Sequence, residues 1–132
     1  MQTAEKRLLC QQKKMHAIPY AQFSTEMRSG KIIKIDDGFT KLLGYTEDDV
    51  KNGLVFKQFV PDLEYSEIIA ELREQFIEKK YACYRHEVVS KTGEIRMIVA
   101  FFTIQNKLLN GHRVLEVSVA DITDYTHFPE TK

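Results

Sequence analysis

Cys83 and His86 form a C-x-x-H pair whose side chains suit a transition metal, because a thiolate and an imidazole each donate a lone pair. The surrounding pattern predicts a β-strand, in which side chains an odd number of positions apart face opposite sides. Cys83 and His86 would then point away from each other. The spacing argues against a shared metal ion, and we predict no metal site in this chain.

His86 has a second chemical use that needs no metal. It falls in phase with Ala82, Tyr84 and Val88, which we expect on the inner face of the same strand. A neutral imidazole on that face can exchange a hydrogen bond with a small molecule, or it can bond within the protein core or at its rim. The sequence leaves both alternatives open.

Side chains that could catalyse a reaction fall into no catalytic pattern. No serine lies in a nucleophile motif such as G-x-S-x-G, and no glycine-rich loop is present to cradle a phosphate. Glu71 and Glu74 lie on the polar side of a predicted helix, where solvation explains them better than paired acid–base work. We therefore predict that this chain is not an enzyme.

The composition limits the class of protein. The chain has 132 residues, which favours one domain around one hydrophobic core. Lys+Arg and Asp+Glu both number 19, so the basic excess of a nucleic-acid-binding protein is missing. No apolar run could span a bilayer, and the N-terminus lacks the apolar centre of a signal peptide. Cys10 and Cys83 form no CxxC pair. We predict a cytoplasmic protein that contacts neither nucleic acid nor a membrane through this segment.

Five stretches of the sequence predict β-strands, and turn signals separate them. Gly30 and Gly93 lie in two of the turns, where glycine takes positive φ without strain. Asn110-Gly111 is a strong hairpin signal at the end of a longer expected connection, 106–111. The predicted strands are 20–27, 31–35, 82–90, 94–105 and 112–123.

Two short helices are predicted between the second and third strands. Asp36 or Asp37 can cap the first, and Gly44 can end it. Thr46 can cap the second, which is expected to end at Gly53. Short capped helices let the chain cross from one side of the sheet to the other without leaving backbone groups unpaired.

A long amphipathic helix is predicted over 62–80, opened by Pro61. A second helix is predicted over 3–17, before Pro19. One face of the long helix carries apolar residues at helical spacing: Tyr65, Ile68, Ile69, Leu72 and Phe76.

The order of elements predicts an α+β fold, with a five-stranded antiparallel sheet that carries helices on one face and an N-terminal flanking helix. Both faces of the strand 94–105 are apolar, so we expect both faces of the sheet to be covered. The helices in the middle of the chain would cover one face. The N-terminal helix, or a second subunit, would cover the other.

Four quoted stretches resemble motifs of the Per-Arnt-Sim (PAS) family over residues 20–124: IDDGFTKLLGYTEDDVKNG, FVPDLE, KTGEIR and VSVADITD. In the first stretch, a strand ends at Asp and a Gly-Tyr pair precedes a capped helix. In the second, Pro-Asp opens the long helix. The third is a hairpin around a glycine, and the fourth closes with Asp-Ile-Thr. The sequence departs from the family at Asp37-Gly38, where Pro-Ala is common, and at Thr92, where Asp is common. Neither change threatens the fold.

The resemblance implies a sensory or regulatory domain of a signal-transduction protein. Such domains bind a small molecule between the long helix and the sheet, or form dimers. It implies that a signal leaves through Asp121, Ile122 and Thr123 toward an effector beyond the C-terminus, often a diguanylate cyclase or a histidine kinase. The expected divisions are a flanking helix (1–18), a PAS domain (19–124) and the start of a linker (125–132).

The residues do not favour the cofactors of two known branches of the family. Heme-binding relatives use a histidine on or near the long helix, and 62–80 contains none. Light-sensing relatives use a reactive cysteine after the second short helix, and the stretch LVFKQFVPD has none. Those relatives also place a glutamine near the flavin, where this chain has Val119. The sequence therefore does not identify a cofactor, and it argues against heme and flavin.

A ligand pocket would be bounded by the long helix, the crossover before it and the sheet. Tyr84 and His86 are its polar members, which suits a small organic ligand with one or two polar groups. The alternative is a ligand-free protein–protein interaction module, and in either case we expect a homodimer. The predicted pocket residues are Leu43, Phe56, Phe59, Ile68, Ile69, Leu72, Tyr84, His86, Val88, Val117 and Val119.

Overall fold

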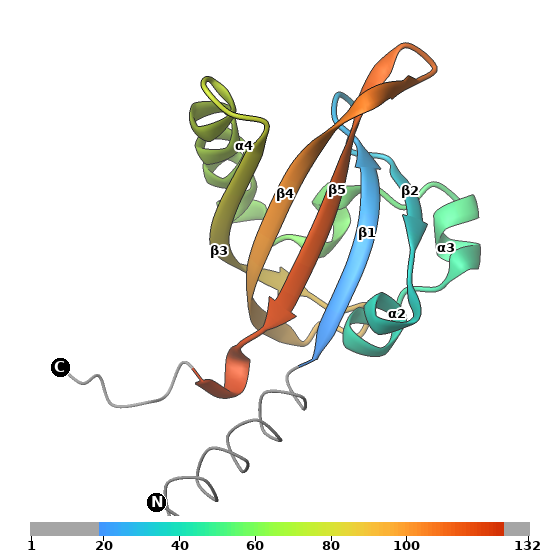
Figure 1. The fold of residues 1–132 in the computed structure, drawn as a ribbon. Helices are drawn as coiled ribbons and strands as arrows, with labels where there is room; N and C mark the ends of the chain where they lie inside the picture. Colours follow the sequence, from blue (N-terminus) through green and yellow to red (C-terminus); the bar gives the residue numbers. More distant parts are fainter. Residues whose placement is uncertain (1–18, 126–132) are drawn as a thin grey trace, which may run out of the picture.

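The computed structural model describes residues 19–125. The predicted flanking helix over 1–18 and the linker after residue 125 lie outside the described residues. The described part forms one antiparallel sheet with helices packed against it (Figure 1). This arrangement confirms the predicted α+β fold.

The sheet has five strands in the order β2-β1-β5-β4-β3. Every pair of neighbours is antiparallel, and β1 joins the two hairpin units by pairing with β5. The strands are β1 (Tyr20–Glu26), β2 (Ile32–Ile35), β3 (Tyr81–Val89), β4 (Ile95–Leu109) and β5 (His112–Asp121).

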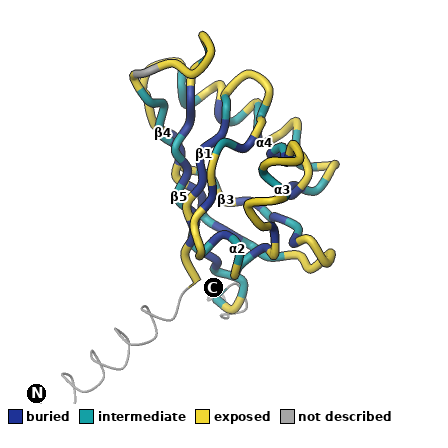
Figure 2. The backbone as a smooth tube through the Cα atoms, turned by 90° about the vertical axis from the view of Figure 1, so that its right-hand side faces the viewer, coloured by how far each residue is buried: buried dark blue, intermediate teal, exposed yellow. Residues whose placement is uncertain are grey.

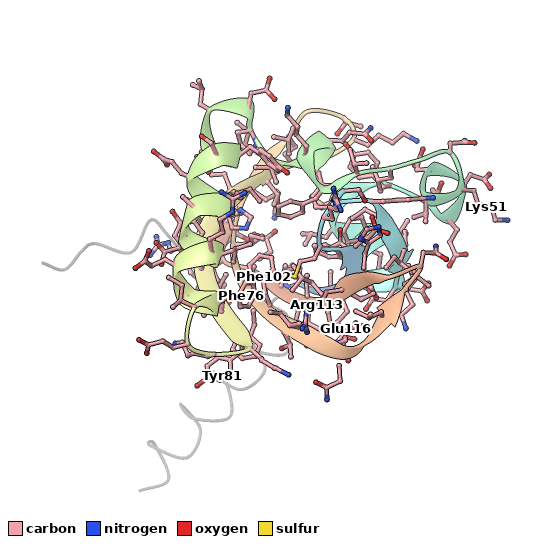
Figure 3. The ribbon with its side chains drawn as sticks, turned by 90° about the horizontal axis from the view of Figure 1, so that it is seen from above. Lys51, Phe76, Tyr81, Phe102, Arg113 and Glu116 are labelled. Atoms are coloured by element: carbon pink, nitrogen blue, oxygen red, sulfur yellow. The ribbon has the colours of Figure 1, made fainter. Side chains whose placement is uncertain are left out.

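The helices lie on one face of the sheet, as Figure 2 shows from the side. Seen from above, α4 runs beside β3, whereas α3 with Lys51 lies at the other end of the layer (Figure 3). The helices are α2 (Asp37–Leu43), α3 (Glu47–Lys51) and α4 (Asp62–Phe76), with two 3₁₀ turns, η1 (Phe56–Phe59) and η2 (Thr123–Tyr125).

Local capping chemistry places the short helices where the sequence predicts them. The Asp36 carboxylate accepts from the backbone N–H of Phe39 at 2.8 Å and starts α2. It also accepts from the N–H of Gln22 at 3.1 Å, which ties the helix to β1. Thr46 and Asp49 cap α3 reciprocally, as a capping box does. Both caps confirm the predicted helix starts.

Two predicted boundaries are wrong by four residues, and the last strand ends at Asp121 rather than at residue 123. The expected loop over 106–111 is mostly strand, because β4 runs to Leu109 and turns within two residues. Asn110 and Gly111 have φ of 51° and 82°, the backbone that a tight hairpin turn requires. The long helix ends at Phe76 rather than at residue 80, so Lys79 and Lys80 lie beyond its C-terminus.

The hydrophobic core lies between the helices and the inner face of the sheet, and appears dark blue in Figure 2. The inward residues of α4, Ile68 and Leu72, are buried, which confirms the predicted phase of the long helix. Aromatic rings fill the centre, and burial of each contributes ~1.5–3 kcal/mol relative to exposure. They come from four elements and from the loop between α2 and α3: Phe23, Phe39, Tyr45, Phe56, Phe59 and Phe102.

The outer face of the sheet is less well covered by the described residues. Along β4, Ile98, Ala100 and Phe102 are buried on the inner side, whereas Phe101 on the outer side is 46% exposed. Its ring stacks on Tyr81 of β3, with the ring centroids 6.0 Å apart. The strand is therefore apolar on both sides, as predicted, but the described residues leave Phe101 on its outer side partly exposed.

Candidate functional site

A small cavity lies in the aromatic core, between the inner face of the sheet and the short helices. Its volume is about 10 Å³, which is about the room that one water molecule needs. His86 is the single polar side chain among the described residues that line it. The others are Phe23, Phe39, Leu42, Leu43, Phe56, Phe59, Val88, Ile98, Ala100, Phe102, Val117 and Val119.

Most of the predicted pocket residues lie around this cavity, although their role in binding stays a prediction. Ile69 and Leu72 instead line a neighbouring hollow of about 40 Å³, which Phe56 also borders. Ile68 is fully buried in the core, and Tyr84 is half-buried on β3. Those that line the cavity are Leu43, Phe56, Phe59, His86, Val88, Val117 and Val119.

Six residues of the cavity wall are missing from the sequence-based prediction. Strand register could have found those on β4, because His86 lies directly opposite Ile98 and the inner face continues through Ala100. The packing of the remaining residues depends on how α2 docks on β1, which no local pattern specifies. The six are Phe23, Phe39, Leu42, Ile98, Ala100 and Phe102.

His86 is held in one orientation by its own strand. Its Nδ1 lies 2.9 Å from the backbone carbonyl oxygen of Glu87. A carbonyl oxygen only accepts hydrogen bonds, so Nδ1 carries the proton and donates it. Burial lowers the pKa of His86 from its usual 6.5, which keeps the ring neutral. The second nitrogen, Nε2, then carries a lone pair.

This second nitrogen is unusual among the buried polar atoms. The His86 residue is 4% exposed. Nε2 is buried and has no hydrogen-bond partner among residues 19–125. Phe56 and Phe102 pack around the ring, with centroids 6.4 Å and 6.5 Å from it, and supply no acceptor or donor. A buried lone pair without a partner costs free energy, so it marks a place where a partner fits.

Cys83 lies on the opposite side of β3 from His86, as strand alternation predicts. Cys83 is exposed to solvent, whereas His86 is buried. The side chain of Gln75 on α4 bonds the backbone N–H and the carbonyl oxygen of Cys83, both at 2.9 Å, and so fastens α4 to β3. Within the described part of the chain, no cluster of three or more His, Cys, Asp or Glu side chains could hold a metal ion.

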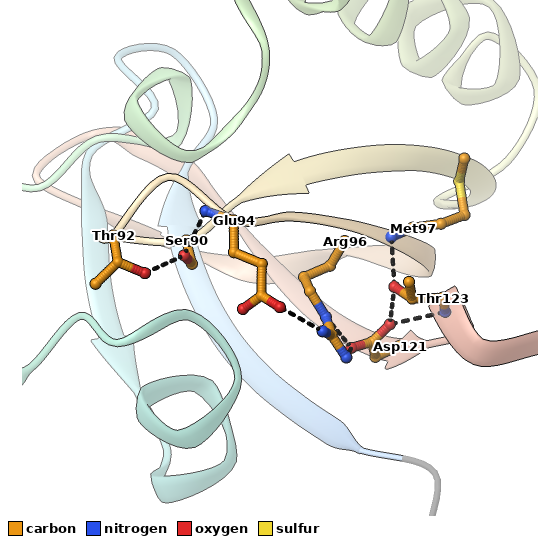
Figure 4. Close-up of polar contacts among 7 residues, drawn as sticks. All are labelled: Ser90, Thr92, Glu94, Arg96, Met97, Asp121 and Thr123. Atoms are coloured by element: carbon orange, nitrogen blue, oxygen red, sulfur yellow. Dashed lines mark hydrogen bonds and ion pairs between the residues drawn. The ribbon is translucent and has the colours of Figure 1, made fainter.

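A polar junction lies at the end of β5, where the predicted signal relay begins (Figure 4). Asp121 is 2% exposed, and its Oδ2 accepts from Arg96 Nε at 2.7 Å and pairs with a second guanidinium nitrogen at 2.6 Å. Its Oδ1 accepts from the backbone N–H of Thr123 at 2.9 Å and from the Thr123 hydroxyl. The bond to Asp121 raises the pKa of Arg96 above its usual value.

The junction also ties together three parts of the backbone. The N–H of Met97 donates to the Thr123 hydroxyl oxygen at 2.8 Å, and the N–H of Ile122 donates to the Met97 carbonyl at 2.8 Å. The N–H of Asp121 donates to the carbonyl of Pro19 at 2.9 Å. The chain therefore enters β1 and leaves β5 at one place, beside β4.

Solved structures with this arrangement include several PAS domains. A PAS domain from Colwellia psychrerythraea is 20% identical in sequence, has a TM-score of 0.68, and the match covers 89% of this chain and 98% of that chain. A PAS domain from a two-component sensor histidine kinase is 12% identical, with a TM-score of 0.63 and the same coverage. The fold is that of a PAS domain.

PAS domains of this shape come from varied organisms. The PAS-B domain of Drosophila melanogaster Cycle, solved with bound ethylene glycol, is 9% identical, with a TM-score of 0.64 over 76% of this chain and 98% of that chain. No protein-family model and no curated protein matches the sequence itself. No helix among the described residues is long and apolar enough to cross a membrane.

Proposed function

We propose that this chain is the sensory domain of a signal-transduction protein, in which a small molecule binds in the cavity beside His86. The observation that carries the proposal is the buried Nε2 of His86, which has no partner among the described residues and belongs to a side chain that lines an apolar cavity. Pockets that bind small molecules combine apolar walls with a few polar groups that fix orientation. The cavity and His86 supply both.

A row of paired residues connects the proposed pocket with the junction at Asp121. His86 on β3 lies directly opposite Ile98 on β4, and Ile98 lies directly opposite Asp121 on β5. Neighbouring strands are about 5 Å apart, so His86 and Asp121 lie roughly 10 Å apart in one row. A ligand that moves β3 or β4 at this row would move the partners of Asp121. We propose that Asp121, Ile122 and Thr123 pass this change to the following segment.

The proposed receiver of the signal is a histidine kinase or a diguanylate cyclase that follows residues 125–132 in the parent protein. The likeness to a PAS domain of a sensor histidine kinase favours the first. In this proposal, residues 19–124 are the sensory unit and have no catalytic role. The exposed free thiol of Cys83 suits the reducing environment of the cytoplasm, where we place the protein.

NMR spectroscopy on the chain tests the sensory role. Backbone spectra would be recorded with a library of small neutral molecules. We expect at least one compound to shift the resonances of cavity residues such as Val88 and, in the same titration, those of Ile122 and Thr123. If no compound moved the cavity resonances, the sensory proposal would be overturned.

The outer face of the sheet supports a second candidate function, formation of a homodimer. The stacked pair of Tyr81 and Phe101 is about half exposed, and Tyr20 and Ile95 are 55% exposed on the same sheet. Exposed aromatic clusters mark protein–protein contacts. We propose that a second copy of the chain covers this face.

Sedimentation at several protein concentrations tests the homodimer. We expect Phe101→Lys to shift the chain toward the monomer. Ile77→Lys is the matched control, because Ile77 is 72% exposed just beyond the end of α4. A chain that stays monomeric at every concentration would overturn this second proposal and leave the sensory proposal intact.

A further inference from the structure

We propose that the cavity selects a small neutral molecule that carries a hydrogen-bond donor, a hydroxyl or an N–H group, on an otherwise apolar body. The donor would bond to His86 Nε2. This inference rests on the proposed sensory function and specifies the chemical class of its ligand. Three features of the site support it: the proton position on the His86 ring, the absence of charge on the described residues that line the cavity, and the hollows that connect the cavity with the surface.

The direction of the missing hydrogen bond is set by the other side of the ring. Nδ1 donates to the Glu87 carbonyl oxygen at 2.9 Å, so its proton is engaged within the strand. The neutral imidazole has one N–H, and Nε2 is therefore an acceptor only. A ligand group that only accepts, such as an ether or a ketone, leaves Nε2 unpartnered and loses this bond.

The walls of the cavity exclude a charged ligand. Among the described residues that line the cavity, every side chain other than His86 is hydrocarbon, and none of these lining side chains carries a charge. Moving an ionised group into such surroundings without a partner costs many kcal/mol. The ligand is therefore neutral, and most of its surface is apolar.

The small volume of the cavity means that a side chain must move before an organic ligand can enter. A cavity of about 10 Å³ holds no more than a water molecule, so an organic ligand needs a side chain to move. Phe56 and Phe102 line both this cavity and the neighbouring hollow of about 40 Å³. Their rings meet edge to face, with centroids 6.4 Å apart. A rotation of Phe56 would join the two spaces.

The neighbouring hollow leads toward the surface beside α4. Five residues line both it and an outer groove of about 280 Å³, on whose rim Arg28 and Arg73 lie. The route therefore runs from the groove, past α4, to Phe56 and then to His86. The shared residues are Met27, Tyr65, Ile69, Leu72 and Leu115.

Phenol and toluene test this inference, because they have similar shape and only phenol carries a donor. Calorimetric titrations would use the Phe56→Ala chain, in which the two spaces are joined, and the same chain with His86→Phe added. We expect the ratio of phenol to toluene affinity to fall about tenfold with His86→Phe. His112→Phe is the matched control and should leave the ratio unchanged, because His112 lies at the start of β5 and lines neither space. If Phe56→Ala does not fold, Phe56→Leu provides a smaller opening.

The outcomes separate the two proposals. A ratio that His86→Phe leaves unchanged, with both compounds bound, overturns the donor requirement and leaves the sensory cavity. Binding of neither compound to the opened chain counts against both the cavity and the donor requirement. A second measurement needs no ligand: ¹⁵N NMR of labelled histidine in the unaltered chain should show the His86 proton on Nδ1. A proton on Nε2 would overturn the inference even if ligands bind.

Discussion

Two buried polar groups lie at the ends of one row across the sheet, and they differ in how fully they are bonded. Both carboxylate oxygens of Asp121 are engaged, by Arg96 and by Thr123. His86 uses one nitrogen, and the other has no partner among the described residues. Both residues are at least 95% buried, so exposure does not explain the difference.

The comparison separates a structural role from a binding role. A satisfied buried ion pair is costly to break, because the remaining charge has no partner. An unsatisfied buried atom is already costly, so its removal can relieve the fold. In the proposed function, Asp121 belongs to the architecture that would carry a signal, and His86 belongs to the site that would receive it. The two regions should respond in opposite directions to mutation.

The largest effect is expected at the Asp121 junction. Asp121→Ala leaves the Arg96 guanidinium without its main partner and removes both bonds to Thr123, so the free energy of unfolding should fall by about 3–5 kcal/mol. Urea denaturation measures it, with Asp124→Ala as a control at an exposed acid in the next turn. A loss as small as that of the control would show that the junction is not structural.

A slightly smaller loss is expected in the wall of the neighbouring hollow. Leu72→Ala removes buried methyl groups from α4 and should lower the free energy of unfolding by about 2–5 kcal/mol. Glu67→Ala, on the exposed side of the same helix, should change it by less than about 0.5 kcal/mol. Equal values from the two variants in the same denaturation series would contradict the packing of α4 on the sheet.

The opposite sign is expected at His86. His86→Phe removes the Nε2 atom that has no partner among the described residues, together with the Nδ1 bond to the Glu87 carbonyl oxygen, and places an apolar ring of similar size there, so the ligand-free chain should gain up to about 1 kcal/mol. Thermal unfolding followed by circular dichroism measures the gain, and His112→Phe beside the β4–β5 turn is the control. A clear loss of stability would mean that Nε2 already has a partner in the folded chain.

The pH dependence of stability offers a smaller and independent comparison. Burial lowers the pKa of folded His86 below its usual 6.5, so below pH 6.5 the unfolded chain binds a proton that the folded chain does not. Stability should therefore fall as the pH drops from about 6.5 toward the folded pKa, although the bond to the Glu87 backbone and the nearby Glu64 carboxylate oppose the lowering of the pKa. The difference between the unaltered chain and His86→Phe, measured at pH 7.5 and 5.5, isolates this contribution. If stability changed equally with pH in the two chains, the lowered pKa of folded His86 would be contradicted.

The smallest effect is expected at the outer edge of the junction. Glu94 pairs with Arg96 at 2.9 Å, but its side chain is 61% exposed. Glu94→Gln should therefore change the free energy of unfolding by less than about 0.5 kcal/mol. A change as large as that of Asp121→Ala would mean that the two acids share the structural role, and the comparison with His86 would need revision.

Local patterns in the sequence determined most of the fold. The caps at Asp36 and Thr46, the apolar face of α4 and the turns at glycine depend on residues a few positions apart, and the structure bears them out. Strand alternation also placed His86 inward and Cys83 outward. The sequence alone predicted these features because near neighbours along the chain decide them.

Contacts between distant parts of the chain decided the rest. A Cβ on Gly38 would lie 2.1 Å from the Tyr20 carbonyl oxygen, so α2 packs closely on β1 only because this residue is glycine. Arg96 and Asp121, 25 positions apart, meet because β4 pairs with β5. The sequence determined which side chains face inward. Tertiary packing decided the volume of the cavity and left Nε2 without a partner among residues 19–125, because both depend on how side chains from several elements fit against one another.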